Sequence, residues 1–449
     1  MGKILNNMNI KREMNYERVF LRGPSYVVSM LARLKGEILK DQIEAAILKV
    51  QKRHPMLNVR IEFDYAHNAW FVSDGINDNI IKVVPRIDNS HWIELIKKEN
   101  FTPFRLDEGP LIKFILLNSP DISDLVVYSH HSICDGLSLV YLIKDILNYI
   151  VNPKMEVKIL PAGPVINKNV IKRGDYGNFL FKLIVKLVNK IWKKKKISFD
   201  EDDFNRLNQK FWNESNISVN FWNLEKIKTS ILIRRCQKEK VTVNSALCAS
   251  FLAAQNETQG NSSKYLRKIA LPVNIRDRLV VEVGENFGCY TSGSFIKLKY
   301  QDNKPFWENV GLIHKKINHE LDNFKIKLVK FTKLHPTLID ALNFYQQGEC
   351  DEKILSSISK ASKWNKLNAG FSISNLGRLN IPLNYDTLQL KAIYGPVTYD
   401  PRIEKFIGIN TINDNIFFAL TYRENIIKRQ IIEDFIDYAM LLLEKSLDL

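Results

Sequence analysis

The sequence predicts an α/β protein built from two halves. Short apolar runs rich in β-branched residues, such as residues 111–117 and 124–128, alternate with segments whose apolar residues recur at helical spacing, such as residues 137–150. Two prolines with a glycine between them interrupt this alternation at residues 161–164, after which it resumes. A chain of 449 residues is long enough for two domains with sizeable cores.

The elements of the first half follow from local patterns. A β-branched run at residues 26–33 predicts a strand, and Gly36 separates it from a helix over residues 39–54. That helix ends before Pro55, which lacks the N–H that a continuing helix needs. Further strands are expected at residues 58–63, 69–72, 111–117 and 124–128, and a further helix over residues 137–150.

The second half shows the same alternation. Helices are predicted at residues 224–238, 307–321 and 430–446, and residues 241–247 are predicted to lead into a further helix that ends at Ala254. Strands are predicted at residues 268–275, 295–298, 369–379, 407–412 and 416–422. Both halves therefore have mixed α/β character.

Residues 128–136, Tyr-Ser-His-His-Ser-Ile-Cys-Asp-Gly, place two imidazoles and a carboxylate in one strand-to-helix turn. Adjacent side chains of a strand point to opposite faces, so His130 and His131 cannot face the same cavity. A neutral imidazole is the usual group for removing a proton near neutral pH. Asp135, next to Gly136, is expected to accept from the loop backbone or to pair with a buried cation. A metal site on His131 and Asp135 is the other interpretation, but the chain has no HExxH or CxxC pattern, so none is expected.

The pattern HHxxxDG resembles the active-site motif of the chloramphenicol-acetyltransferase-like superfamily. That superfamily includes condensation domains of nonribosomal peptide synthetases, alcohol O-acetyltransferases and polyketide-associated acyltransferases. The resemblance implies two subdomains of the chloramphenicol-acetyltransferase type, arranged as a V around a central active-site tunnel. They would occupy residues 20–165 and 206–449, joined by a basic amphipathic connector at residues 166–205. The resemblance also implies that the catalytic set is His131, His130, Asp135 and Gly136, with His131 as the general base.

A partner for the motif aspartate is implied by the same resemblance. The predicted strand at residues 268–275 ends at Arg-Asp-Arg, and Arg276 matches the superfamily's arginine that pairs with the motif aspartate. Arg276 would thus form a buried ion pair with Asp135, with Arg278 as the alternative. A surface turn is the other interpretation of this tripeptide. His54, which is followed by Pro55, matches a structural landmark and is not expected to be catalytic.

The segment Ser374-Asn375-Leu376-Gly377 resembles a sequence motif of the alcohol-acetyltransferase and polyketide-associated branches that lies near their active site. Ser374 or Asn375 would then donate a hydrogen bond to the tetrahedral oxyanion. Serine, asparagine and glycine are also the residues that a tight turn uses, so a purely structural role is equally compatible with this segment.

Acyl transfer from a thioester is the activity that this resemblance implies. No bound cofactor is expected, because the acyl donor, either acyl coenzyme A or a phosphopantetheine-linked acyl group, is a substrate. A hydroxyl acceptor is preferred; a freestanding condensation enzyme that makes an amide, and a non-catalytic scaffold that binds a carrier or a membrane, are the alternatives. Cys134 and Ser132 are not expected to act as nucleophiles.

The formal net charge of +16 calls for an anionic partner or a basic solvated surface. Nucleic acid is not expected, since no recognised binding motif accompanies the charge. The phosphates of coenzyme A, an acidic acyl or peptidyl carrier protein and acidic lipid headgroups are the other candidates. Five scattered cysteines, no signal-like segment and no long apolar run favour a cytoplasmic protein.

The most basic segment lies between the two halves. Residues 168–196 contain ten Lys or Arg and one acidic residue, Asp175, and residues 179–196 combine lysines at helical spacing with many apolar side chains. Such a helix would lie at a membrane surface with Lys193 to Lys196 near anionic headgroups. Alternatively, it is a connecting helix whose broad apolar side is buried between the halves.

Overall fold

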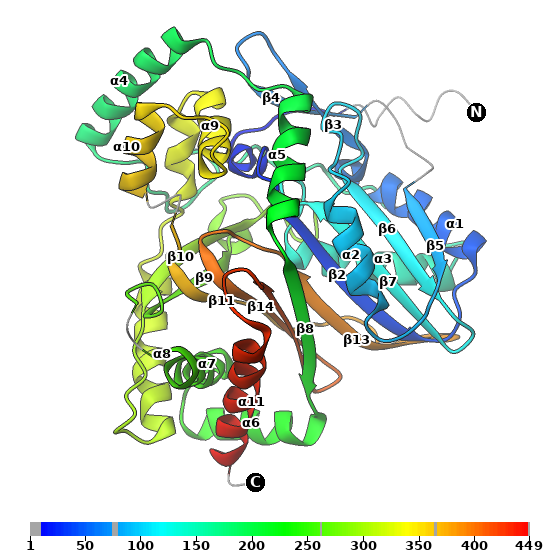
Figure 1. Cartoon of the computed structure of the whole chain (residues 1–449). Helices are drawn as coiled ribbons and strands as arrows, with labels where there is room; N and C mark the ends of the chain where they lie inside the picture. Colours follow the sequence, from blue (N-terminus) through cyan, green and yellow to red (C-terminus); the bar gives the residue numbers. More distant parts are fainter. Residues whose placement is uncertain (1–9, 74–79, 261–262, 363–365, 448–449) are drawn as a thin grey trace.

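The computed structural model describes residues 10–73, 80–260, 263–362 and 366–447, and two six-stranded sheets dominate it (Figure 1). The first sheet has the strand order β12, β13, β2, β7, β6, β5. Its strands are β12 (Asn384–Tyr385), β13 (Leu388–Val397), β2 (Val27–Lys35), β7 (Ile122–His130), β6 (Ile112–Asn118) and β5 (Ile81–Pro85). The helices of this half are α1 (Lys40–Arg53), α2 (His91–Asn100) and α3 (Gly136–Val151), of which α1 and α3 pack against each other.

The second sheet has the order β10, β9, β11, β14, β15, β8. Its strands are β10 (Thr291–Lys297), β9 (Lys268–Asn274), β11 (Ala369–Arg378), β14 (Ile403–Ile412), β15 (Asn415–Arg423) and β8 (Ile217–Leu224). The helices α6 (Lys226–Lys238), α7 (Val243–Gln259), α8 (Phe306–Asp322) and α11 (Arg429–Lys445) contribute to one apolar core with it. The predicted α/β fold with two sheet-containing halves is confirmed.

One strand pair crosses from the second half to the first sheet. The antiparallel strands β12 and β13 follow β11 in sequence, yet β13 pairs with β2, with Ile393 opposite Ala32. The Asn410 side chain of β14 donates to the Ile393 carbonyl oxygen at 2.9 Å and so ties this crossing strand to the second sheet. The predicted division at residues 166–205 did not include this exchange, because an alternating pattern shows which face of a strand is buried and not which strand it joins.

The remaining elements lie around these two sheets. A small sheet is formed by β1 (Lys11–Glu13), β4 (Ala69–Ser73) and β3 (Val59–Phe63). Additional helices are α4 (Phe179–Lys195), α5 (Glu201–Glu214), α9 (Pro336–Gln346) and α10 (Lys353–Ser362). Short 3-10 helices are η2 (Tyr16–Phe20), η3 (Pro55–Asn58), η4 (Arg276–Arg278) and η5 (Leu328–Lys333). Of the α-helices and strands of the described residues, β1, β5, β8, β12, β13, α2, α5, α9 and α10 had no predicted counterpart.

Helix α4 does not behave as a buried connector. It protrudes beside α9 and α10 at the edge of the molecule (Figure 1), and only Val185 and Trp192 of its residues are buried. The apolar side chains of Phe179, Leu180, Leu183, Ile184, Leu187 and Ile191 are exposed. The alternative in which the broad apolar side is buried between the halves is therefore wrong. No helix of the described residues is long and apolar enough to cross a membrane.

Candidate active site

The motif loop follows the central strand β7 and leads directly into α3. The backbone N–H of His130 donates to the Leu111 carbonyl at 2.9 Å, and that of His131 donates to the Tyr26 carbonyl at 2.8 Å. The chain is thus held on both sides at the strand end, and the two imidazoles point in opposite directions as predicted.

His131 is held in one tautomer and one orientation. Its Nδ1 lies 2.8 Å from the Cys134 carbonyl oxygen, which can only accept, so Nδ1 carries the proton and Nε2 keeps a basic lone pair. The Phe20 ring stacks on the imidazole, with 4.6 Å between ring centroids. Burial lowers the pKa of His131 from its ordinary value of 6.5, against the opposing effect of the Cys134 carbonyl. A neutral, oriented imidazole is what a general base requires.

His130 lies on the opposite, closed side of the strand. Its Nδ1 is 2.7 Å from the Ser132 hydroxyl, and its ring meets Phe104 edge to face. Burial, followed by the neighbouring His131, lowers the pKa of His130 to about 3, so this imidazole stays neutral at physiological pH. These contacts support a structural part for His130 in the motif.

Asp135 is held by groups from both halves of the molecule. Its carboxylate accepts from Arg276 Nη1 at 2.8 Å and Nη2 at 3.1 Å, and both side chains are only 7% exposed. It also caps α3 by accepting from the Ser138 N–H at 2.8 Å, and it accepts from the Tyr290 N–H at 2.9 Å. Burial alone would raise the pKa of Asp135, but Arg276 and the backbone donors outweigh it and hold that pKa below its ordinary value.

The position of Arg276 rules out the two other interpretations of its tripeptide. The guanidinium also donates to the Ser138 hydroxyl at 2.9 Å and lies over the Tyr290 ring, 4.6 Å from its centroid. Arg278 instead donates to the Leu321 carbonyl at 3.2 Å. The aspartate partner is therefore Arg276, and it is buried, not part of a surface turn.

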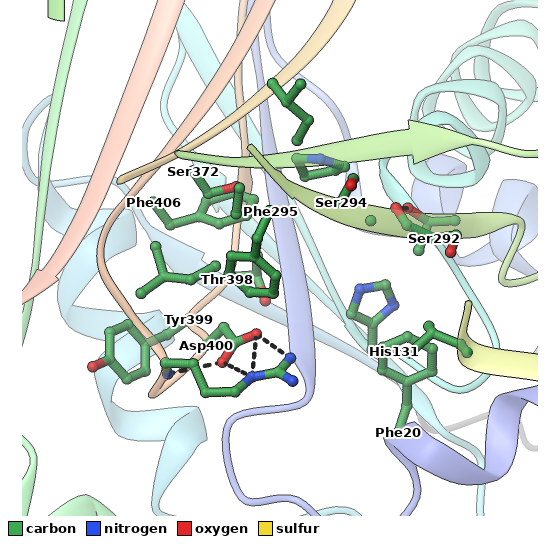
Figure 2. Close-up of a pocket in the computed structure, with 18 of the residues that line it drawn as sticks. Phe20, His131, Ser292, Ser294, Phe295, Ser372, Thr398, Tyr399, Asp400 and Phe406 are labelled. Atoms are coloured by element: carbon green, nitrogen blue, oxygen red, sulfur yellow. Dashed lines mark hydrogen bonds and ion pairs between the residues drawn. The ribbon is translucent and has the colours of Figure 1, made fainter. Parts of the chain in front are cut away.

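The His131 ring points into a cavity of about 180 Å³ between the two sheets (Figure 2). The cavity is mostly apolar, with Phe295 and Phe406 from the second sheet on its wall. An ion pair between Asp400 and Arg402, with Nη2 and Oδ2 2.6 Å apart, forms its polar side. Burial opposes the charge on Asp400, but Arg402 keeps the pKa of Asp400 below its ordinary value. The site thus consists of a base that faces a mostly apolar cavity with one ion pair on its wall.

Comparison with known proteins connects this geometry to a family. Residues 12–165 match the model of the Condensation domain family. The whole chain superposes on the trichothecene 15-O-acetyltransferase TRI3 of Fusarium sporotrichioides, with a TM-score of 0.68 over 99% of this chain and 97% of that one, at 10% identity. Residues 12–165 therefore resemble the Condensation domain family, and the whole chain has the fold of that acetyltransferase.

Two further solved structures show the same whole-chain similarity. The first condensation domain of the calcium-dependent antibiotic synthetase superposes with a TM-score of 0.64 over 98% of this chain and 97% of that one, at 11% identity. Polyketide synthase associated protein 5 of Mycobacterium tuberculosis gives 0.60 over 97% of both chains, at 14% identity. At these identities the likeness establishes the fold and not the reaction.

Curated relatives match only about a quarter of the chain. The nonribosomal peptide synthetase agiA of Aspergillus flavus is 27% identical over 127 residues, which are 28% of this chain and 2% of that protein. The bassianolide nonribosomal cyclodepsipeptide synthetase of Beauveria bassiana is 27% identical over 116 residues, or 25% of this chain and 4% of that one. The chain therefore spans a few per cent of the length of the curated relatives it matches.

The predicted oxyanion donors lie beside the motif and not on the cavity wall. Ser374 and Asn375 are on β11, whereas the β11 residue that lines the cavity is Ser372 (Figure 2). The side-chain oxygen of Asn375 accepts from the Gly377 N–H at 2.8 Å, as the turn interpretation predicts. Gly136 packs so closely against Leu376 that an added Cβ would lie 3.1 Å from a Leu376 methyl group. The segment thus supports the start of α3.

The other nucleophiles of the motif loop are not placed to react. Cys134 is buried, and burial raises the pKa of its thiol. The Ser132 hydroxyl is engaged with His130. In the described part of the chain, no three His, Cys, Asp or Glu side chains are grouped to hold a metal ion. His54 lies against α3, where its Nε2 is 2.9 Å from Asp145.

Sequence reasoning missed three residues around His131. Phe20 comes from η2, and Asp400 and Arg402 come from the connection between β13 and β14. None of the three stands in a motif, and each reaches the cavity only through folding. The sole local signal was the polar pair Asp400 and Arg402 in a tight turn before an apolar strand.

Proposed function

We propose that this protein is an acyltransferase that moves an acyl group from a thioester to a hydroxyl acceptor, with His131 as the general base. The observation that carries the proposal is the fixed tautomer of His131, whose basic Nε2 belongs to a ring that faces the cavity. The lowered pKa keeps that nitrogen unprotonated at neutral pH. The Cys289 thiol lies 3.8 Å from His131 Nδ1, on the protonated side of the ring and not at the basic Nε2, and burial raises the pKa of this thiol well above the ordinary value. Direct attack by the acceptor is therefore favoured.

The reaction then proceeds through one tetrahedral intermediate. His131 takes the proton from the acceptor hydroxyl as its oxygen bonds to the thioester carbonyl carbon. When the intermediate collapses, the carbon–sulfur bond breaks and the departing thiolate receives the proton from His131. Thiolate is a good leaving group, so the step needs no covalent enzyme intermediate and no resident cofactor. Neither predicted oxyanion donor lines the cavity; of the two, Ser374 is preferred, because the Asn375 side-chain amide already donates to Asn244 Oδ1 at 3.3 Å.

Both candidate donors, acyl coenzyme A and an acyl group on a carrier protein, present the same thioester. The net charge of +16 favours encounter with the phosphates of coenzyme A and with an acidic carrier protein. The apolar wall formed by residues such as Phe295 and Phe406 suits an acyl chain. The hydroxyl preference rests on the resemblance of the Ser374–Gly377 segment to the O-acyltransferase branches.

A second candidate function is supported by the comparisons. The match of residues 12–165 to the Condensation domain family and the nonribosomal peptide synthetases among the relatives favour amide formation between carrier-bound substrates. The intact His131 and the ion pair of Asp135 with Arg276 favour either reaction over a non-catalytic scaffold.

The deciding experiment incubates the full chain with short, medium and long acyl groups on coenzyme A and on a carrier protein. Alcohol and amine acceptors are added separately, and thiol release and the acylated product are followed, with the His131→Ala variant as the control. Ester formation by the wild type alone supports the proposal. Amide formation that requires a carrier-bound donor would support the second candidate. No turnover with any combination of donor and acceptor would support the non-catalytic scaffold.

A further inference from the structure

Helix α4 exposes an unusual amount of apolar surface for its length. Phe179 is 75% exposed, Leu180 62% and Leu187 58%. Three more large aliphatic side chains of the same helix, Leu183, Ile184 and Ile191, are also exposed. Exposed apolar residues scattered singly are normal, but a contiguous group marks an interaction surface.

The side chains of α4 divide into three faces at about 100° per residue. Val185, Asn189 and Trp192 share the face that packs on the body of the protein. The exposed apolar side chains form a stripe along a second face. The stripe consists of Leu180, Ile184, Leu187 and Ile191, which follow the helical spacing i, i+4, i+7 and i+11, with Leu183 beside them. Four exposed lysines cover the third face: Lys182, Lys186, Lys190 and Lys193.

The orientation of the helix is fixed by specific contacts. The Trp192 indole N–H donates to the Thr337 hydroxyl at 2.9 Å. The Asn189 amide donates to the Lys333 carbonyl oxygen at 2.9 Å and accepts from the His335 N–H at 2.9 Å. Because these bonds hold α4 against α9 and η5, rotation of the helix to bury the stripe would break them. The stripe is therefore a stable feature of the surface.

The charge of α4 restricts what can cover it. The helix and its C-cap Lys196 carry seven lysines and no acidic residue, and the one lysine of this group in an ion pair is Lys195, 3.1 Å from Glu352. A second copy of the chain docked through this face would bring two such helices together, which like charges oppose. An anionic surface that also accepts large aliphatic side chains matches both properties, and a lipid bilayer with acidic headgroups has both.

We propose that α4 docks this protein on an anionic lipid surface. The helix would lie in the plane of the membrane, with Leu180, Ile184 and Leu187 at the level of the acyl chains. The flanking lysines would reach the headgroups with their ammonium ends while their stems rest on the apolar layer. This geometry fits a helix of 17 residues in a chain whose described helices cannot span a bilayer. The proposal stands independently of the acyl-transfer reaction.

Co-sedimentation of the full chain with vesicles tests the proposal. Vesicles of phosphatidylcholine with a quarter of phosphatidylglycerol are compared with vesicles of phosphatidylcholine alone. The variant Leu183→Ser/Ile184→Ser/Leu187→Ser should bind anionic vesicles at least about tenfold more weakly than the wild type, because interfacial binding scales with buried apolar area. Its control, Ile87→Ser/Ile227→Ser/Leu441→Ser, removes aliphatic side chains elsewhere that are on average more exposed, and it should bind as the wild type does.

The lysines are tested separately. Lys186→Gln/Lys190→Gln/Lys193→Gln should weaken binding to anionic vesicles about tenfold or more, since each basic residue near such a surface contributes about 1 kcal/mol. The control Lys299→Gln/Lys315→Gln/Lys316→Gln makes the same change of net charge at exposed lysines outside α4, in the loop after β10 and on α8, and should retain binding. Equal loss in both lysine variants would reduce the effect to net charge and overturn the specific role of α4.

Two further results would also overturn the proposal. One is equal vesicle recovery of the wild type and the apolar α4 variant. The other is a wild type that sediments as a dimer at equilibrium and becomes monomeric in the apolar variant, which would assign the stripe to a second copy. Thiol release from a water-soluble substrate should be unchanged in the α4 variants, so a failed membrane test and a failed acyl-transfer proposal remain distinguishable.

Discussion

The motif loop between β7 and α3 and the helix α4 differ in where their characteristic side chains lie: those of the loop are buried or held by hydrogen bonds, and those of α4 are exposed. In the loop, Asp135 is buried and its carboxylate is paired with Arg276, and the Nδ1 proton of His131 is bound by a carbonyl. In α4, large apolar side chains such as Leu187 face outward. Catalysis by a general base needs one fixed geometry, whereas docking needs apolar surface that the fold leaves uncovered.

The two regions are nonetheless connected by one short element. Leu328 of η5 lines the cavity of His131, and the carbonyl of Lys333 at the end of η5 accepts the hydrogen bond from Asn189 of α4. The loop and the helix therefore differ in function, although η5 connects them in the structure. Substitutions in each region test this difference.

The largest effect is expected from His131→Ala. Loss of the base should lower kcat for acyl transfer by about 10²- to 10⁴-fold, because that is the usual contribution of a positioned proton acceptor. The melting temperature should change little, since the partly exposed ring makes its main contacts with Phe20 and the Cys134 carbonyl. His319→Ala, at an exposed position of α8, is the control and should leave both quantities unchanged.

Next in size is the response to Asp135→Ala. Removing the carboxylate leaves Arg276 buried without its anion, so the free energy of unfolding should fall by about 3–5 kcal/mol in urea denaturation. The double variant Asp135→Ala/Arg276→Met should recover part of that loss, because it removes the uncompensated charge. The single variant Arg276→Met is measured as well. If the loss of unfolding free energy in the double variant equals the sum of the losses in the two single variants, the ion pair is not the source of stability.

The pH dependence of transfer should show the state of His131. The base must be unprotonated, so kcat/KM falls as the pH drops through the pKa of His131, by about tenfold per pH unit. Since burial lowers that pKa from 6.5, the acid limb should lie below pH 6.5, with a plateau through neutral pH. A half-maximal rate clearly above pH 6.5 would mean that a different group, or an imidazole beside an anion, controls the reaction.

The sequence was most informative where chemistry is local. His131, Asp135 and the start of α3 lie within a few residues, so their pattern indicated a base and a carboxylate that binds the loop backbone or a buried cation. Arg276 was found through resemblance and its contacts with Asp135 then follow from the fold. Phe20 and Arg402 could not be found in this way, since ordinary residues from distant segments meet His131 only in three dimensions.

Two structural features show the same limit. β13 pairs with β2, far away in the sequence, and no pattern within residues 388–397 shows which strand it joins. For α4, residue spacing was enough to predict the helix and its lysines, but apolar residues on two of its three faces fit burial as well as exposure. Only the contacts of Trp192 and Asn189 show which face is packed.

The smallest effect is expected at the exposed face of α4 and completes the contrast. Leu187→Ala should change the free energy of unfolding by less than about 0.5 kcal/mol, because substitutions of exposed side chains remove little packing. Leu342→Ala is the matched control: it truncates the same side chain in the buried cluster around Trp192 and should cost about 2–5 kcal/mol. Urea denaturation of both variants measures the difference. A loss at Leu187 as large as that at Leu342 would mean that the stripe is covered in the folded protein in solution, and α4 would then contribute to stability in the same way as the motif loop.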